Sequence, residues 1–355
     1  AGTKGQNQPM EKNALEKSRA NEVNEMNKGK VVVGMSGGVD STVAAYLLNK
    51  QGYEVTGVTL RMWDGEGTEK AIADAKRVAD SIGISHEILD CREAFRTCVV
   101  NRMVKEKSLL DKAKEIGGKY IATGHYARIE KHPKTGRYAI RNSATAEKDQ
   151  TYALYRLTQE QLSRTLFPLG TLTKPEVRCL AEAHGLVSAH KRDSQDICFI
   201  PDGDYAGFID RCVGEASPTG PFLDEAGRVL GQHKGFVRYT KGQHKGLGLA
   251  IEPPLYVTKK DSATHAIYVG PSGALFTTEL TAGEWNGIAL AELTAPVTVS
   301  VKTRYSQREA EATVEPLLGG RFRLRFREPQ RAVTPGQFAV LYDGEDVVGS
   351  GVILE

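Results

Sequence analysis

Short apolar runs that alternate with helical patterns dominate the first half of the chain. The run 31–33 consists of three β-branched valines, which is typical of a buried strand. Further strands are predicted at 54–60, 85–89 and 120–123, and apolar residues recur at helical spacing between them, as over 68–82. Strands that alternate with helices predict an α/β fold with a doubly wound parallel sheet, in which ligands bind at the carboxyl ends of the strands.

From about residue 291 the pattern changes to alternating strands separated by turns. Four arginines occupy every second position from Arg321 to Arg327, with apolar residues between them. In a strand this spacing places the arginines on one face and the apolar residues on the core face. The arginine face is then a solvated surface, an RNA contact, or one side of a set of ion pairs, because like charges repel unless acids or phosphates meet them. Acids on one face of the preceding predicted strand are Glu309, Glu311 and Glu315.

A glycine-rich turn follows the first predicted strand, with the sequence GMSGGVDS at residues 34–41. Gly37 and Gly38 let the backbone turn tightly and approach a ligand closely. Consecutive backbone N–H groups at the start of a helix favour an anion, and Ser36 and Ser41 add hydroxyl donors. We therefore predict a phosphate or pyrophosphate site. The turn matches neither GxxxxGK(S/T) nor GxGxxG, and the alternative is a glycine-rich turn without a ligand.

Composition limits the class of protein. A length of 355 residues predicts two or three domains. With 26% charged and 40% apolar residues the chain fits a globular protein, and its net charge of +3 does not decide whether it binds nucleic acid. No apolar run approaches the length of a membrane helix, so no membrane association is expected.

The cysteines and the N-terminal segment point to the cytoplasm. The five cysteines form no CxxC pair, which argues against a disulfide framework or a thiolate zinc site, and no metal site is predicted. Reduced thiols are expected instead, any one of which could be catalytic. Residues 1–30 lack an apolar secretory core and carry six Lys or Arg and four Glu, and we interpret them as a flexible tail.

A basic segment spans residues 226–251, with five Lys or Arg, two His and no acid. Phe236 and Tyr239 lie among these residues. Basic residues with interleaved aromatics suit phosphate contacts and base stacking, and the alternative is a solvated surface rich in loops.

Ordered motifs along the chain resemble one family. SGGVDS resembles the PP-loop of ATP pyrophosphatases, which release pyrophosphate while adenylating a substrate. Together with five later motifs it resembles the tRNA-specific 2-thiouridylase family over residues 31–355. These motifs are ATGHYAR at 122–128, KDQTY at 148–152, DSQDICFI at 193–200, GQHKGLG at 242–248 and TPGQ at 334–337.

The resemblance implies an enzyme, a tRNA-uridine 2-sulfurtransferase. ATP adenylates the 2-carbonyl oxygen of the wobble uridine, a cysteine persulfide delivers sulfur, and Mg²⁺ accompanies ATP as its counter-ion. Cys198 matches the persulfide cysteine, and Asp40 is assigned a catalytic role. The residues implied in ATP binding are Gly34, Met35, Ser36, Gly37, Gly38, Val39, Asp40, Ser41, Leu60 and Gly124.

The resemblance also implies partners and a domain order. The partners are tRNA and a persulfide donor, either a cysteine desulfurase or a sulfur-carrier protein. We expect a PP-loop domain over 31–212, a small central tRNA-contacting domain over 213–274 and a C-terminal β-barrel over 275–355. The implied tRNA contacts are His125, Lys148, Asp149, Gln150, Arg304, Tyr305 and Gln337.

One segment departs from the family. The second catalytic cysteine of the family lies in a TPNPxxxCN segment that this sequence lacks, just before the helix that leads to ATGHY. In the preferred alignment the segment is missing between Glu106 and Lys107, and Cys98 lies in a helix. In the alternative alignment, Cys98 to Arg102 is a shortened form of the Cys-Asn-Arg motif.

Two other function classes stay open. Another PP-loop ligase, such as a nucleotide, NAD or argininosuccinate synthetase, needs neither Cys198 nor a barrel that contacts RNA. An RNA-binding protein with a degenerate catalytic loop would explain the missing segment.

Overall fold

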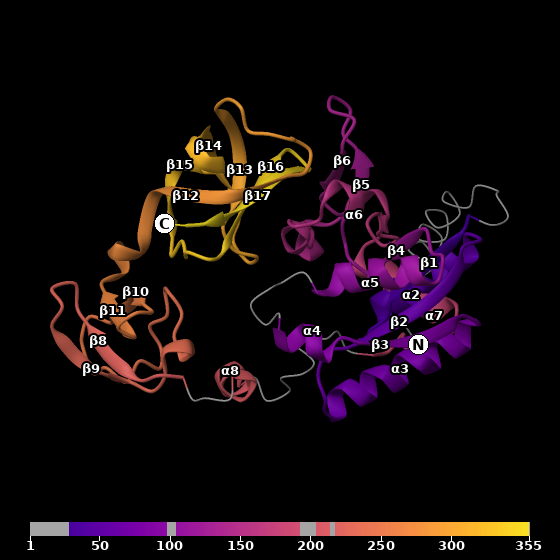
Figure 1. Cartoon of the computed structure of the whole chain (residues 1–355), viewed down its shortest axis with the longest axis horizontal. Helices are drawn as coiled ribbons and strands as arrows, with labels where there is room; N and C mark the ends of the chain where they lie inside the picture. The colour runs from indigo at the N-terminus through magenta and orange to yellow at the C-terminus, as the bar shows by residue number, and fades with distance from the viewer. Residues whose placement is uncertain (1–27, 98–103, 192–203, 214–216, 355) are drawn as a thin grey trace, which may run out of the picture. The chain divides into compact units, whose positions relative to one another are not determined.

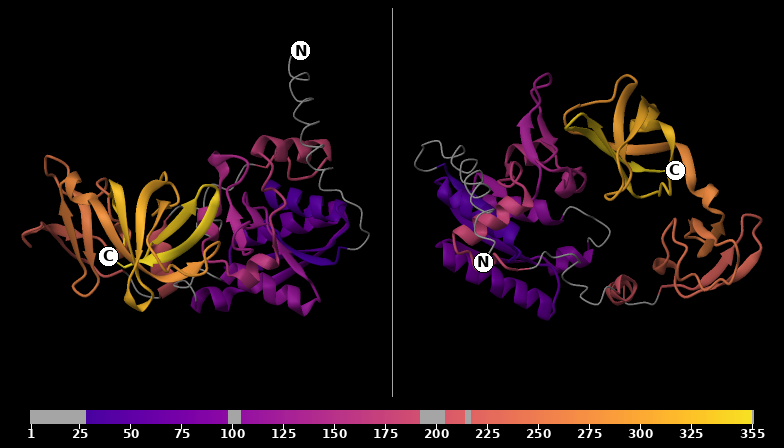
Figure 2. Two further views of the ribbon diagram at one scale, coloured as in Figure 1. Left: turned by 90° about the horizontal axis from the view of Figure 1, so that it is seen from above. Right: turned by 180° about the vertical axis from the view of Figure 1, so that it is seen from behind.

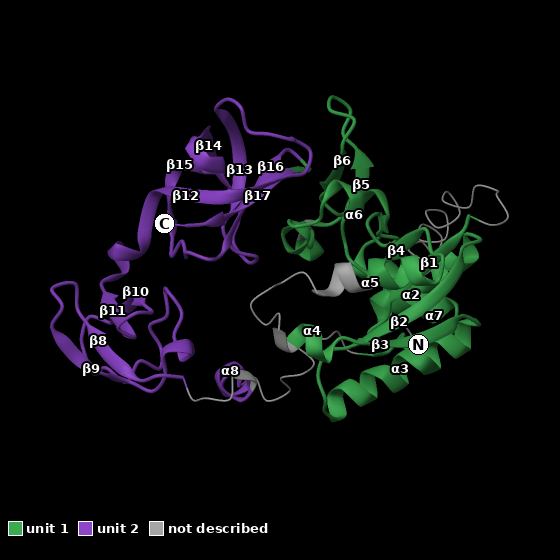
Figure 3. Cartoon of the chain, viewed as in Figure 1, with its two compact units in different colours: residues 1–201, 345–347 green, residues 202–344, 348–355 purple. Residues whose placement is uncertain are grey.

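The computed structural model describes residues 28–97, 104–191, 204–213 and 217–354. The described residues form two compact units (Figure 3). Unit 1 takes those up to residue 201 together with 345–347, and unit 2 takes 202–344 with 348–355.

A parallel five-stranded sheet forms the centre of unit 1 (Figure 1), in the order β3-β2-β1-β4-β7. All four neighbouring pairs are parallel. The predicted α/β fold is confirmed, and the predicted strands are found within one or two residues. The strands are β1 (Lys30–Gly34), β2 (Glu54–Arg61), β3 (Ser85–Asp90), β4 (Tyr120–Ala122) and β7 (Thr165–Leu166).

The valines of β1 alternate between two cores, because successive side chains of a strand point to opposite faces. Val31 and Val33 pack with residues of α2 (Val39–Lys50) and α3 (Glu66–Ile82). Val32 packs with Leu109 and Leu110 of α5 (Val104–Glu115). Because both faces of β1 are covered by apolar groups, all three positions of the run 31–33 are valine and no polar residue alternates with them.

The rest of unit 1 surrounds this sheet. Helix α7 (Lys174–Ala183) begins with a capping box, in which the side chains of Thr173 and Glu176 accept hydrogen bonds from each other's backbone N–H groups. Sequence analysis did not predict the hairpin of β5 (Arg128–Lys131) and β6 (Tyr138–Arg141). The remaining elements are α4 (Arg92–Thr97), η1 (Ala146–Lys148), η2 (Thr151–Leu154) and α6 (Gln159–Ser163).

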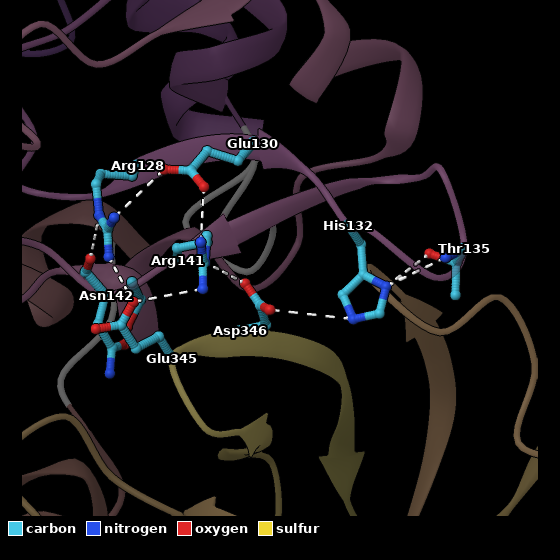
Figure 4. A network of polar contacts seen from close by, with 9 residues as sticks. Arg128, Glu130, His132, Thr135, Arg141, Asn142, Glu345 and Asp346 are labelled. Atoms are coloured by element: carbon cyan, nitrogen blue, oxygen red, sulfur yellow. Dashed lines mark hydrogen bonds and ion pairs between the residues drawn. The ribbon is translucent and has the colours of Figure 1, made fainter.

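Arginines of this hairpin hold residues 345 and 346 within unit 1 (Figure 4). The Arg141 Nε lies 2.7 Å from a carboxylate oxygen of Asp346, and Arg128 donates to Glu345 at 2.7 Å. Glu130 accepts from both arginines. The acids around Arg141, with Glu130 contributing most, raise the pKa of its guanidinium.

Unit 2 begins with α8 (Tyr205–Val213) and a four-stranded sheet of order β10-β11-β8-β9. Its core contains Phe222, Tyr239, Val257 and Ile267. The elements are β8 (Gly220–Leu223), β9 (Val229–His233), η3 (Phe236–Arg238), β10 (Tyr256–Asp261) and β11 (Ala266–Gly270).

Six strands then close into a barrel, because β12 pairs with both β15 and β17 (Figure 2). Closure leaves no unpaired edge between the first and last strands. The C-terminal barrel predicted from the resemblance is confirmed. Its strands are β12 (Phe276–Gly287), β13 (Val297–Lys302), β14 (Ala310–Pro316), β15 (Phe322–Arg331), β16 (Phe338–Asp343) and β17 (Asp346–Ile353), with η4 (Ser272–Leu275) and η5 (Leu318–Gly320) at turns.

Candidate functional site

The glycine-rich turn at residues 34–41, called the glycine loop below, joins the central strand β1 to helix α2 at the carboxyl end of the sheet. Gly38 is the N-cap of α2 and no side chain caps this end. Gly37 has φ +70°, and a Cβ there would lie 2.8 Å from the Asp74 Cβ. The loop therefore requires glycine at residue 37, and the positive end of the α2 dipole lies beside it.

The two serines of the loop bond within it. The Ser36 N–H donates to the Ser41 Oγ at 3.3 Å, and the two hydroxyl oxygens are 3.4 Å apart. Ser41 Oγ donates in turn to the Gly38 carbonyl at 3.2 Å. Ser41 is buried and Ser36 is exposed, so Ser36 is the serine that presents its side chain to solvent.

Asp40 is held from two other elements. The Lys174 Nζ, at the start of α7, lies 2.6 and 2.7 Å from the two carboxylate oxygens of Asp40. The buried Tyr126 donates its hydroxyl hydrogen to the same carboxylate at 2.7 Å. These contacts fix the first turn of α2, and the catalytic role of Asp40 stays a prediction. The sequence offered no signal that Lys174 or Tyr126 would meet Asp40.

Gly124 contacts the loop through its backbone. A Cβ there would lie 2.7 Å from the Asp40 carbonyl carbon and 2.8 Å from the Ser41 nitrogen. Gly124 therefore packs directly against the first turn of α2. Beside it, the Thr123 Oγ1 and the His125 Nδ1 are 2.6 Å apart.

Met35 and Leu60 point their side chains into the protein. Met35 is buried, and a Cβ on Gly57 would collide with its sulfur. Leu60 packs against the core that β1 shares with α5. The structure thus leaves the backbone as the part of Met35 that a nucleotide can contact.

A buried hydrogen-bond chain supports the loop from the neighbouring strands. The Thr59 hydroxyl donates to the Met35 carbonyl at 2.9 Å, and its oxygen lies 2.9 Å from the His86 Nε2. Because Thr59 uses its hydrogen on Met35, His86 donates to it through Nε2. Burial lowers the pKa of His86, which favours the neutral ring.

The site so far is a glycine-rich loop at an uncapped helix end, and sequence comparisons with known proteins define the family of the chain. Sequence models match as a tRNA methyl transferase HUP domain over 29–106 and 97–202, a tRNA methyl transferase PRC-barrel domain over 206–271, and an aminomethyltransferase beta-barrel domain over 277–353. The tRNA-specific 2-thiouridylase MnmA of Acetivibrio thermocellus is 43% identical, covering 92% of this chain and 100% of that protein. MnmA 1 of Caldanaerobacter subterraneus is 46% identical, covering 91% and 97%.

The chain belongs to the tRNA-specific 2-thiouridylase family. Among solved structures, the U34-tRNA thiolase NcsA of Methanococcus maripaludis aligns with a TM-score of 0.37 at 18% identity, covering 58% of this chain and 74% of that one. The NMN synthetase of Francisella tularensis aligns with a TM-score of 0.37 at 16% identity, covering 60% and 88%.

The segment in which this chain departs from its family lies close to the start of α5. The preferred alignment puts the missing segment between Glu106 and Lys107, and α5 is continuous across these residues from Val104 to Glu115. Two helical segments joined by a deletion also form a continuous helix, so this position stays a prediction. The alternative alignment, with the shortened motif at 98–102, stays open. Residues 97–106 belong to both matched segments of the family model.

Cys198, which is predicted to carry the sulfur, lies outside the described residues, as does Cys98. Of the other cysteines, Cys91 is buried and Cys179 is half-buried in α7. Cys198 as the persulfide carrier stays a prediction.

The residues predicted to contact tRNA in unit 1 differ in their hydrogen bonding and in their exposure. Asp149 accepts from the Ser143 N–H at 3.0 Å and from the Thr151 hydroxyl at 2.5 Å. Gln150 accepts from the Tyr126 N–H at 2.9 Å. These two side chains shape their loop, whereas Lys148 is exposed.

In unit 2, two further residues predicted to contact tRNA, Arg304 and Gln337, both donate hydrogen bonds to Thr334. The Arg304 Nη2 donates to the Thr334 Oγ1 at 2.8 Å and to the Ala332 carbonyl at 2.6 Å. The Gln337 N–H donates to the Thr334 carbonyl at 3.1 Å. Tyr305, next to Arg304, is 56% exposed. All seven tRNA assignments stay predictions.

Both aromatics of the basic segment pack with a hydrophobic core. Tyr239 is buried, with its ring centroid 5.2 Å from that of Phe222. Phe236 packs against the same core, and Lys260 covers its ring at 4.2 Å. The stacking expected of Tyr239 is wrong, because its ring is buried in this core. The stacking expected of Phe236, which is half-buried, stays a prediction. Lys234 and Lys245 are exposed.

Acids pair with three of the four arginines on the arginine face of the barrel. Phe322, Leu324 and Phe326 are buried, as the period of two predicts. Their arginine neighbours form ion pairs across the strands: Arg323 with Glu279, Arg325 with Glu279 and Glu315, and Arg327 with Glu311. The ion-pair interpretation is confirmed for these three arginines.

No helix in the described part of the chain is both long and apolar enough to cross a membrane.

Proposed function

We propose that this chain is an ATP-dependent tRNA-uridine 2-sulfurtransferase that acts on the wobble uridine. The observation that carries the proposal is the glycine loop, whose N–H groups lie at an uncapped helix end after the central strand. Such an end favours the phosphates of ATP. Family membership supplies the reaction class, since relatives over 40% identical are named tRNA-specific 2-thiouridylases.

The proposed reaction has two chemical steps. The 2-carbonyl oxygen of uridine attacks the α-phosphorus of ATP, the bond between the α-phosphorus and the bridging oxygen breaks, and pyrophosphate leaves. The terminal sulfur of a Cys198 persulfide then attacks C2, and AMP leaves with the former carbonyl oxygen. The remaining sulfur–sulfur bond is cleaved by a second thiol, which leaves a disulfide at Cys198, or by an external reductant. Adenylation is needed because the carbonyl oxygen is a poor leaving group.

Partners follow from this chemistry. The sulfur comes from a cysteine desulfurase or a sulfur-carrier protein, and the reaction takes place in the cytoplasm. We expect Mg²⁺ to accompany ATP as the counter-ion of its phosphates. In the described part of the chain, no group of three or more His, Cys, Asp or Glu could hold a metal ion.

The test is a reconstituted thiolation. Unmodified tRNA is incubated with the protein, ATP, Mg²⁺, and a cysteine desulfurase with cysteine, and 2-thiouridine is measured by mass spectrometry of digested nucleosides. We expect thiouridine with ATP and none without it. ATP-pyrophosphate exchange that needs no tRNA, with no thiouridine, would point to another PP-loop ligase.

A second candidate is an RNA-binding protein with a degenerate catalytic loop. The observation that favours it is the family segment TPNPxxxCN, which this sequence lacks. Tight tRNA binding with neither thiouridine nor tRNA-dependent pyrophosphate exchange would support this candidate.

A further inference from the structure

Helix α3 lies directly against the glycine loop. A Cβ on Gly37 would lie 2.8 Å from the Asp74 Cβ, and 3.1 Å from both the Ala71 carbonyl oxygen and the Ala75 nitrogen. The backbone of the loop thus rests directly on one turn of α3. Asp74 is the acidic residue of that turn, and its side chain is only 10% exposed.

A lysine that is distant in the sequence forms hydrogen bonds with both the glycine loop and α3. The Lys191 Nζ donates to the Gly37 carbonyl at 3.1 Å and to the Asp74 Oδ2 at 2.6 Å. Lys191 follows α7 and is 117 positions from Asp74. Arg77 also pairs with Asp74, but it is largely exposed and comes from the same helix.

The hydrogen bond from Lys191 to the Gly37 carbonyl fixes the orientation of the peptide unit between Gly37 and Gly38. The peptide unit between Gly37 and Gly38 is planar and trans, so its C=O and N–H groups point to opposite sides. A carbonyl that is fixed toward Lys191 and α3 directs the Gly38 N–H away from α3. Glycine has no side chain to restrict this peptide, and without Lys191 the unit could rotate.

Asp74 keeps Lys191 in place. The hydrogen bond from Lys191, with Arg77 adding to it, holds the pKa of Asp74 below its usual range, so the carboxylate is charged at neutral pH. An ammonium group shared between a carboxylate and a carbonyl has a defined position, unlike a lysine in water.

We infer that Lys191, held by Asp74, is a positioning residue that orients the Gly37–Gly38 peptide toward the phosphates of ATP. The inference rests on the proposed use of ATP, and goes beyond it by assigning Lys191 to the phosphate site.

The test compares Lys191→Met with Arg77→Met. Both variants remove one cation from Asp74, but only the first removes the donor to Gly37. Binding of ATP, pyrophosphate and AMP is measured by calorimetry on the full chain without tRNA or sulfur donor. We expect Lys191→Met to weaken ATP and pyrophosphate about tenfold and AMP less than twofold. Arg77→Met should change all three less than twofold.

Two further variants separate positioning from folding. Lys191→Arg keeps a donor and should bind ATP within threefold of the wild type. Asp74→Asn should show a smaller loss than Lys191→Met, because Lys191 can still reach Gly37. The thermal unfolding midpoint of each variant shows whether it is folded.

Three outcomes overturn the inference. Lys191→Met could bind ATP like the wild type, or it could lose ATP and AMP equally. Lys191→Met could also lose no more than Arg77→Met. In each case wild-type ATP binding leaves the proposed function intact. A wild-type chain that binds no ATP contradicts both.

Discussion

At the scale of single residues, the candidate site depends on positions where no side chain fits. Gly37 lies on α3 and Gly124 lies on the first turn of α2, each at a distance that excludes a Cβ. The glycine pattern predicted a tight turn and the structure confirms it. The partners of Asp40 were not predictable, because Tyr126 is 86 residues away and Lys174 is 134 residues away.

Gly37→Ala should abolish ATP-dependent activity, because the added methyl group meets Asp74 and the α3 backbone. The matched control is Gly136→Ala, since Gly136 has φ +67° and nothing within 4 Å of its added Cβ. Both variants carry the strain of a positive φ, about 1–2 kcal/mol. Thiolation assays and urea unfolding measure the two effects. Equal activity of the two variants would contradict the steric role of Gly37.

Asp74 gives a pH dependence whose sign follows from its ion pairs. Lys191 and Arg77 lower its pKa from 3.8 in the folded state. Its stabilising contribution is therefore complete above pH 3.8 and is lost as the pH falls through the lower folded pKa. The free energy of unfolding should fall more steeply below pH 3.8 in the wild type than in Asp74→Asn. Parallel curves from urea unfolding would show that Asp74 contributes nothing.

At the scale of elements, one strand shows how a charge pattern can mislead. The arginines of β15 suggest an RNA surface, yet Glu279, Glu311 and Glu315 pair with three of them. Exposed lysines of the basic segment, such as Lys245, lie on a stretch that contains no acid. Phosphate binding should depend on such lysines more than on β15.

Arg325→Gln and Lys245→Gln test this difference in the full chain. We expect Arg325→Gln to change tRNA affinity less than twofold, because Arg325 is already paired. Lys245→Gln should weaken binding severalfold and reduce the slope of log affinity against log salt by about 1. Filter binding between low and physiological salt measures both. A larger loss in Arg325→Gln would place β15 in the tRNA interface.

Elements with strong local periodicity were predictable, and those made by distant pairing were not. β1, β2 and α3 were predicted from buried runs and helical spacing. β7 has two residues, and β8 contains glycine and proline, so neither shows an alternating pattern. Tyr239 was misassigned because its sequence neighbours are basic while its core partners, such as Phe222, are not adjacent.

At the scale of the whole molecule, the proposed sulfur transfer depends on which cysteine carries the persulfide. Cys91 is buried and Cys179 is half-buried in a helix next to core residues. Cys198 lies in the DSQDICFI motif, preceded by Lys191 and Arg192. Nearby cations favour the thiolate, which is the form that accepts sulfur. Cys198 is therefore the residue we expect to carry the persulfide.

Serine variants of three cysteines test the sulfur path in the full chain. After incubation with a desulfurase and cysteine, the wild type should gain one sulfur atom in intact mass, and reduction should remove it. Cys198→Ser should gain none and form no thiouridine, while it still binds ATP. Cys179→Ser is the matched control and should behave like the wild type, because Cys179 is half-buried in α7 and lies outside the DSQDICFI motif. A fully active Cys198→Ser would exclude the persulfide mechanism.

Cys98→Ser decides between the two alignments of the missing segment. In the alternative alignment, residues 98–102 form a shortened Cys-Asn-Arg motif just before the helix that leads to ATGHY. If Cys98 is the family's second cysteine, it cleaves the sulfur–sulfur bond at Cys198 and releases the thiolated base. Cys98→Ser should then accept the persulfide but release no thiouridine in a single turnover without reductant, whereas the wild type releases one equivalent and is left with a Cys98–Cys198 disulfide. Dithiothreitol should restore release in the variant. One equivalent of thiouridine released by Cys98→Ser without added reductant would mean that Cys98 takes no part, and that the thiolated base is released by another thiol.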